Sequence, residues 1–169
     1  MDFYNPIPTS VLDWMQSTWI NEFVVGYAWS WPALETLHFI GMCLLFGPII
    51  IMDLRLLGFD RAAIPVVSVH TLVPLTVIGF AINLITGIMF CLGDPYRYAV
   101  NISFQLKMVL VLLAGLNALF FWLRVTPILE ATDPNSEPPA MIKIVGLSSL
   151  LLWTGVLCFG RLIPYLGTG

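Results

Sequence analysis

Residues 65–92 read PVVSVHTLVPLTVIGFAINLITGIMFCL, a stretch that contains no Asp, Glu, Lys or Arg. A helix needs about 20 apolar residues to cross the hydrocarbon core of a bilayer, so this stretch is long enough to span a membrane. Three other apolar stretches of similar length lie at about residues 32–52, 102–123 and 141–163. The sequence therefore predicts an all-α membrane protein in which four transmembrane helices form an up-down bundle.

The composition of the whole chain agrees with this class. Of its 169 residues, 59% are hydrophobic and 10% are charged, which is too apolar for a soluble domain of this size. The net charge is -3, and the seven Lys and Arg residues are scattered singly. The chain thus lacks the basic patch that nucleic-acid binding requires, and we exclude nucleic acid as a partner. The expected partner is the lipid bilayer.

We divide the chain into an N-terminal segment, residues 1–31, and a four-helix transmembrane domain, residues 32–169. In the first segment, Thr9 and Ser10 are good N-cap residues. After them, apolar residues recur at helical spacing at Val11, Met15, Trp19, Phe23 and Tyr27. We expect one interfacial amphipathic helix, with its tryptophans in the headgroup zone of the membrane.

Positively charged residues set the expected orientation. Four of them follow the first and third spans, at Arg55, Arg61, Arg124 and Lys143. Two lie on the opposite side, at Arg97 and Arg161. Because cytoplasmic loops carry the excess of Lys and Arg, this pattern predicts that both termini lie outside the cytoplasm.

Ionisable side chains inside the spans mark the candidate site, because each one costs about 2.5 to 3.5 kcal/mol on insertion scales. Glu35 and His38 are three residues apart in the first span and therefore share a helix face. Lys107 lies about one and a half turns into the third span and enters from the same side. We predict an ion pair between Glu35 and Lys107 with His38 beside it; the alternative is a structural pair that only fixes helix register.

Antiparallel spans bring further polar residues to the same level of the membrane. The end of the second span brings Asn83 and Thr86, and the end of the fourth brings Arg161. The second histidine, His70, starts the second span at the opposite side. At about 1.5 Å of rise per residue, His38 and His70 differ in depth by about 20 Å, so they cannot ligate one metal within one chain.

Two sequence motifs in tandem carry a resemblance to a known family. They are Trp31-Pro32-x-x-Glu35-Thr36-Leu37-His38 and Asp53-Leu54-Arg55-Leu56-Leu57-Gly58, supported by Gly79-Phe80, Thr86-Gly87 and Phe104-x-x-Lys107. Over about residues 10–125 the chain resembles small uncharacterised bacterial membrane proteins with four spans. It is more distantly similar to copper-resistance D-type proteins and cytochrome b561-like bundles, whose spans carry histidines for copper or haem b. The resemblance implies a metal or haem site at His38 and places the protein in the bacterial inner membrane. In that membrane, the orientation expected from the positive residues puts both termini in the periplasm.

Haem b needs one or two axial ligands, an apolar slot and cations for its propionates. His38 would supply one imidazole, and Arg97 or Arg161 would hold the propionates. The second axial position stays open between Met42, Met108, a neutral Lys107, a side chain of a second subunit, and no ligand at all. If His70 also binds, the protein carries two haems stacked across the membrane.

The leading hypothesis is a haem b-binding membrane protein for electron transfer or redox sensing. It would be a homo-oligomer that exchanges electrons with a quinone or a redox protein. The alternatives are an accessory structural subunit and a copper-handling or small-solute transport protein that uses Glu35, His38 and Lys107 with the soft ligands Met42 and Cys43. The sequence shows no Ser-His-Asp set, so an electron-transfer or binding protein is favoured over a hydrolase.

Overall fold

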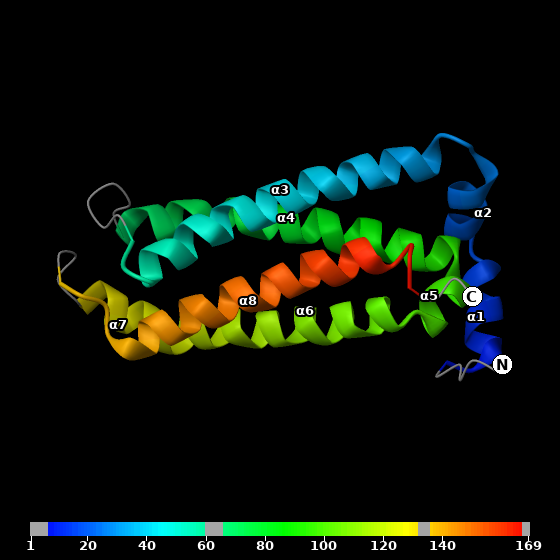
Figure 1. Cartoon of the computed structure of the whole chain (residues 1–169). Helices are drawn as coiled ribbons and strands as arrows, with labels where there is room; N and C mark the ends of the chain where they lie inside the picture. The colour runs from blue at the N-terminus through cyan, green and yellow to red at the C-terminus, as the bar shows by residue number, and fades with distance from the viewer. Residues whose placement is uncertain (1–6, 60–65, 132–135, 167–169) are drawn as a thin grey trace.

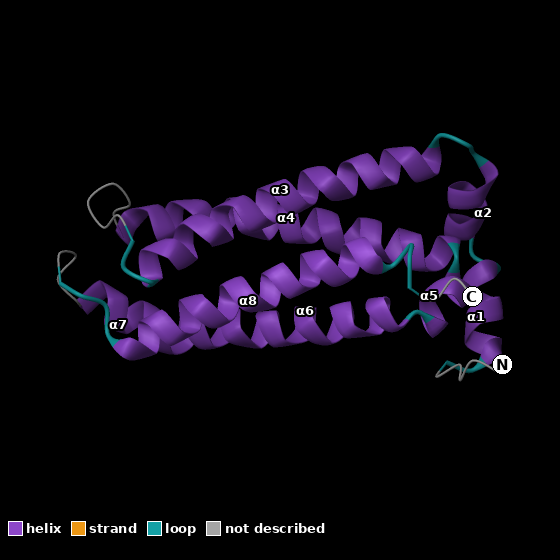
Figure 2. Ribbon diagram, viewed as in Figure 1, coloured by secondary structure: helices purple, strands orange, loops and turns teal. Residues whose placement is uncertain are grey.

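The computed structural model describes residues 7–59, 66–131 and 136–166, with only the backbone described for residues 66–70 and 130. Within these ranges the chain contains helices and no strand (Figures 1 and 2). Four long helices run side by side: α3 (Ser30–Leu56), α4 (Val66–Gly93), α6 (Ile102–Phe120) and α8 (Ala140–Leu162). Each contains or begins a stretch long and apolar enough to cross a membrane. The predicted all-α bundle of four spans is confirmed.

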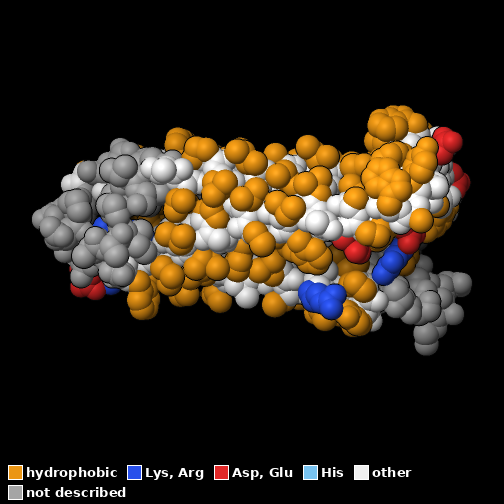
Figure 3. Space-filling model, turned by 90° about the horizontal axis from the view of Figure 1, so that it is seen from above, with side chains coloured by type: hydrophobic (Ala, Val, Ile, Leu, Met, Phe, Trp, Pro, Cys, Tyr) orange, Lys and Arg blue, Asp and Glu red, His pale blue; other side chains and the backbone are white. Residues whose placement is uncertain are grey.

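The outer surface of the bundle is apolar along most of its length. Figure 3 shows hydrophobic side chains over the middle of the molecule, whereas the charged side chains that it draws lie toward the two ends. A soluble protein rarely exposes a continuous apolar surface of this kind. The protein is therefore a multi-pass membrane protein, with this surface facing lipid.

The first and third spans are longer than predicted. Helix α3 continues to Leu56, so Asp53 and Arg55 lie in its last turns, where both are buried. Helix α6 continues through a π-helical turn, η1 (Phe121–Val125), into α7 (Thr126–Ala131). The cause is Pro127, which lacks an N–H group and would crowd the carbonyl four residues earlier; the chain widens into a π turn instead of ending the helix.

The N-terminal segment forms two short helices, α1 (Thr9–Gln16) and α2 (Trp19–Gly26), so the prediction of a single helix is wrong. The break lies at two hydroxyl residues: Ser17 and Thr18 donate hydrogen bonds to the carbonyls of Trp14 and Met15, both at 2.7 Å. Thr18 then caps α2 by accepting from the Asn21 amide. Both short helices lie across one end of the bundle (Figure 1).

The four spans pack as two close pairs, α3 with α4 and α6 with α8, which meet mainly where α3 contacts α8. Gly79 of α4 lies at the closest approach of the first pair. A Cβ atom at Gly79 would lie 2.5 Å from the backbone nitrogen of Leu45 and 2.7 Å from the carbonyl oxygen of Gly41. Only a residue without a side chain allows α3 and α4 to approach so closely.

Substituting Gly79 by alanine is expected to push α3 and α4 apart and to lower the free energy of unfolding by about 1 to 3 kcal/mol. Gly87 in the same helix is the matched control, because a Cβ there would meet no atom within 4 Å. Thermal unfolding of both variants in detergent measures the difference. Equal melting temperatures for Gly79→Ala and Gly87→Ala would contradict the close contact.

A short helix, α5 (Pro95–Val100), leads from α4 to α6 and ends at Asn101, a fully buried side chain. The Asn101 side-chain oxygen accepts a hydrogen bond from the Phe104 amide at 3.0 Å and so caps α6. Its side-chain nitrogen donates to the carbonyls of Ile163 at 2.8 Å and Leu166 at the end of α8. One amide thus joins the start of the third span to the end of the fourth.

Asn101→Asp is expected to lower the free energy of unfolding by about 1 to 3 kcal/mol or more. The carboxylate can still cap α6, but it cannot donate hydrogen bonds to the two carbonyls. Asn101→Ala, which loses all three hydrogen bonds but brings no charge, is the comparison. Denaturation in detergent at neutral pH measures both. Wild-type stability of Asn101→Asp would show that the two carbonyl contacts contribute nothing.

Candidate functional site

Polar side chains from three spans and α5 meet near the end of the bundle that carries α1 and α2. We call this set the His38 layer. It consists of Glu35 and His38 from α3, Thr86 and Cys91 from α4, Tyr98 from α5, and Lys107 from α6.

His38 is held by a buried hydroxyl. Its Nδ1 atom lies 2.6 Å from Oγ1 of Thr86, which is fully buried, and the same hydroxyl lies 2.8 Å from the carbonyl oxygen of Ile82. A hydroxyl has one proton. When Thr86 donates it to the Ile82 carbonyl, it must accept from an Nδ1–H group of His38, which leaves the lone pair on Nε2. Metal-binding histidines are commonly oriented in this way.

Aromatic side chains line the space beside His38. The ring of Phe90 meets the imidazole edge to face, with 5.6 Å between ring centroids, and Trp31 packs on Phe90 at 5.2 Å. The indole N–H of Trp31 donates to Glu35 at 3.2 Å. The half-buried imidazole therefore lies against an apolar wall whose outer edge carries a carboxylate.

The predicted ion pair between Glu35 and Lys107 is not formed. Among the residues that the structure describes, Lys143 and Glu137 form an ion pair, whereas Glu35 bonds to Trp31 one turn earlier on its own helix. Lys107 turns toward α8, where its ammonium group would lie 3.5 Å from a Cβ atom at Gly160. It still lies near His38 and Cys91. The shared level of these residues was predicted correctly, but the pairing was wrong.

Tyr98 completes the layer and was not predicted from the sequence. The pKa of Tyr98 is raised to about 12, mainly by burial and to a smaller extent by the nearby Cys91. Its phenol therefore stays protonated at physiological pH. The ring packs edge to face on Phe104 at 5.1 Å. The signal that could have found it is the turn Asp94-Pro95, which starts a short helix and so brings Tyr98 back toward the bundle.

The structure places the predicted propionate partners at this same end. Arg97 lies in α5, and its Nε atom is buried without a hydrogen-bond partner among the described residues. Arg161 lies in the last turn of α8, where it donates to the Tyr165 hydroxyl at 3.1 Å and stacks over that ring. His70 lies in the first turns of α4 at the far end, and its side chain falls outside the described residues. Its predicted role as a metal ligand stays a prediction.

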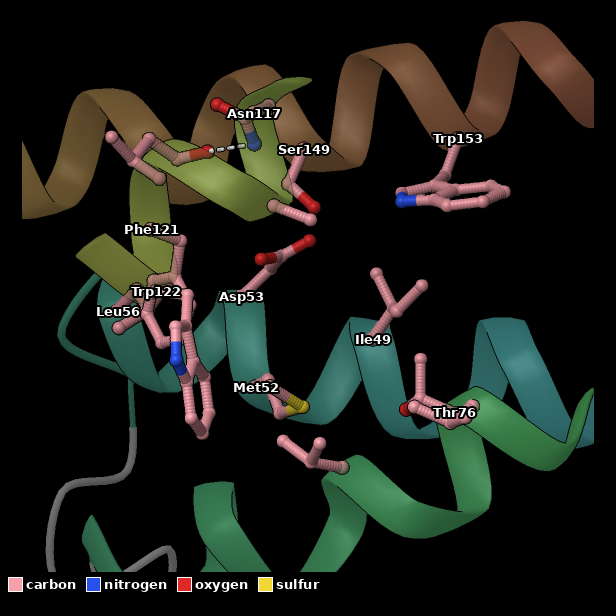
Figure 4. A pocket seen from close by; sticks show the side chains of 14 residues that line it. Ile49, Met52, Asp53, Leu56, Thr76, Asn117, Phe121, Trp122, Ser149 and Trp153 are labelled. Atoms are coloured by element: carbon pink, nitrogen blue, oxygen red, sulfur yellow. Dashed lines mark hydrogen bonds between the residues drawn. The ribbon is translucent and has the colours of Figure 1, made fainter. Parts of the chain in front are cut away.

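A second polar residue, Asp53, lies at the opposite end of the bundle and was also missed. In the structure it is buried in a cavity of about 200 Å³ that all four spanning segments line (Figure 4). We call this space the Asp53 cavity.

Residues 9–166 match the sequence profile of a family described as Family of unknown function (DUF6644). The matched residues include α1, α2 and all four spans. No curated protein and no solved structure matches the chain. The match agrees with the predicted resemblance to an uncharacterised family, whereas the likeness to copper-resistance D-type and cytochrome b561-like proteins stays a prediction.

Proposed function

Because the chain belongs to the DUF6644 family, whose function is unknown, we propose its function from its own residues: it binds haem b through His38 and serves electron transfer or redox sensing. The observation that carries the proposal is the contact between His38 Nδ1 and Thr86 Oγ1, at 2.6 Å. This contact leaves Nε2 of a membrane-embedded imidazole as the atom that would bind iron.

The residues around His38 fit the requirements of a haem. Thr86 would fix the imidazole ring, while Phe90 and Trp31 would cover the macrocycle and keep water away. Arg97 would face the propionates as a cation. When bound, a haem b supplies a reversible one-electron centre.

The structure narrows the choice of a second axial ligand. Met108 exposes 47% of its surface on the outside of α6. Met42 lies one turn after His38 on the same helix face, so the two cannot take opposite sides of one macrocycle. Lys107, a side chain of a second subunit, or an open sixth position remain. A ligand from a second subunit would suit a homo-oligomer, and an open sixth position would suit a sensor.

The copper alternative has less support. Among the described residues, no three His, Cys, Asp or Glu side chains come together in a way that could hold a metal ion. Cys43, which follows Met42 in α3, is the other soft ligand near His38 in the sequence. Its side chain is exposed on the outside of α3. A single oriented imidazole suits haem, which supplies four of the iron ligands itself.

We further propose that the protein lies in the bacterial inner membrane with both termini in the periplasm. The His38 layer would then face the periplasmic side, where a quinone or a redox protein could exchange electrons with it. The predicted likeness to cytochrome b561-like bundles is in line with this assignment. The excess of positive residues at the other end of the bundle, including Arg55, Arg124 and Lys143, supports the orientation.

The proposal is tested by the haem content of protein purified from haem-replete cells. We expect one haem b per protomer, measured by the pyridine haemochrome assay, and the same ratio in His70→Ala. Loss of haem in His70→Ala with retention in His38→Ala would move the site to the other side of the membrane. Absence of haem from the wild type would refute the proposal.

A further inference from the structure

The Asp53 cavity lies at the end of the bundle opposite the His38 layer. Fifteen residues of α3 separate His38 from Asp53, which corresponds to about 22 Å along the helix. The cavity is lined by side chains of α3, α4, α6 with η1, and α8 (Figure 4). Asp53 and Leu56 belong to the second motif of the resemblance, but neither the resemblance nor the proposed haem site gives the cavity a role, so it requires an explanation of its own.

Asp53 is the charged group of this cavity. Only 4% of its surface is exposed, and its Oδ2 atom is buried without a hydrogen-bond partner among the described residues. The hydroxyl of Ser149 from α8 faces the carboxyl group (Figure 4). No Lys, Arg or His is among the described residues that line the cavity. A buried carboxylate without a cation is strongly unfavourable, so Asp53 either takes up a proton or pairs with a positively charged occupant.

Aromatic side chains line the same space. Phe121 and Trp122 come from the π turn η1, and Trp153 comes from α8 (Figure 4). Aromatic ring faces attract cations within about 6 Å, most strongly when water is excluded. Single π turns inside α-helices recur at functional sites, and here the turn contributes two of the lining rings.

We propose that the Asp53 cavity binds a small organic ammonium ion, with its charge on Asp53 and its apolar part against Trp122, Trp153 and Phe121. The lining explains why the occupant is organic rather than metallic. Calcium takes six to eight oxygen ligands and magnesium six, whereas this cavity offers one carboxylate, few other polar groups and mainly apolar walls. Its volume of about 200 Å³ lies below the range of drug-sized sites, which indicates a small amine.

The test compares a charged probe with a neutral one of the same shape, by isothermal titration of the full-length protein in detergent. The probes are benzylammonium and benzyl alcohol. We expect the wild type to bind benzylammonium at least about tenfold more tightly, since one charge-assisted contact in a dry site is worth that much. Equal affinities for the two probes would overturn the proposal.

Three variants locate the site. Asp53→Asn is expected to abolish the preference for benzylammonium, whereas Glu22→Gln, which neutralises an exposed carboxylate on α2, is expected to keep it. Trp122→Leu is a second cavity variant, which keeps the Asp53 carboxylate. Because 54% of the Trp122 side chain is exposed, we expect this variant to fold even if Asp53→Asn does not. It should weaken binding of benzylammonium several-fold. A preference that survives in Asp53→Asn, or an unchanged affinity for benzylammonium in Trp122→Leu, would show binding elsewhere and overturn the assignment.

Discussion

His38→Ala is expected to leave less than about a tenth of the wild-type haem content, because it removes the imidazole that would hold the iron. The half-buried side chain lies in a polar layer without a second histidine among the described residues. The remaining candidate ligand on a neighbouring helix is Lys107, whose side chain packs against Gly160 of α8. The measurement is haem per protomer after purification from haem-replete cells.

External imidazole provides the control for this variant. The alanine leaves a space where the ring was, so added imidazole should restore part of the haem signal if His38 was an iron ligand. Size-exclusion chromatography and circular dichroism show whether the variant is folded. A folded His38→Ala protein with wild-type haem content would remove His38 from the site.

Thr86→Val is expected to weaken haem binding by about 10- to 100-fold, since partners that orient a metal-binding histidine have effects of this size. Valine keeps the shape of threonine but lacks the hydroxyl that lies 2.6 Å from Nδ1 of His38. The ring then loses its hydrogen bond, and its tautomer and orientation are no longer fixed. Titration of haem into the apoprotein measures the change in affinity.

Thr86→Ser is the matched control, because it keeps the hydroxyl and removes only a methyl group. It should bind haem within a few-fold of the wild type. The reduction potential of the bound haem is a second readout, which a purely structural role of Thr86 would not move. If valine and serine at this position behave alike, the hydrogen bond has no role in the site.

The four spans could be predicted because length and apolarity alone distinguish a membrane helix. The end of the third span could not. Arg124 and Pro127 are typical of a helix end, yet η1 and α7 carry the helix on to Ala131. A proline removes one hydrogen bond, and the neighbouring packing of Val125 and Leu129 in a buried cluster stabilises the continued helix.

The split of the N-terminal segment shows a second limit of sequence patterns. Apolar residues keep their helical spacing from Val11 to Tyr27, which predicts one helix. The hydroxyls of Ser17 and Thr18 compete for backbone carbonyls and end α1. Asn21 then ties α2 to the end of α4 by donating to the carbonyls of Leu92 and Gly93, a contact that no local pattern encodes.

The sequence predicted that the candidate-site residues lie at one depth in the membrane, but it did not predict their contacts. Helical rise placed His38, Thr86 and Lys107 at one depth, and the structure brings them together. The direction of each side chain depends on its neighbours: Trp31 holds Glu35 outward, and Gly160 leaves room for Lys107. The Asp53 cavity depends on packing between four spans and was therefore beyond sequence reasoning.

The central claim is that His38 binds haem b, and the visible spectrum of the purified wild-type protein tests it most directly. The protein is grown with ample haem, purified in detergent, and measured first oxidised and then after reduction with dithionite. We predict a Soret band that sharpens and shifts on reduction, with haem b identified by the pyridine haemochrome. A colourless protein, folded by circular dichroism, would contradict the account.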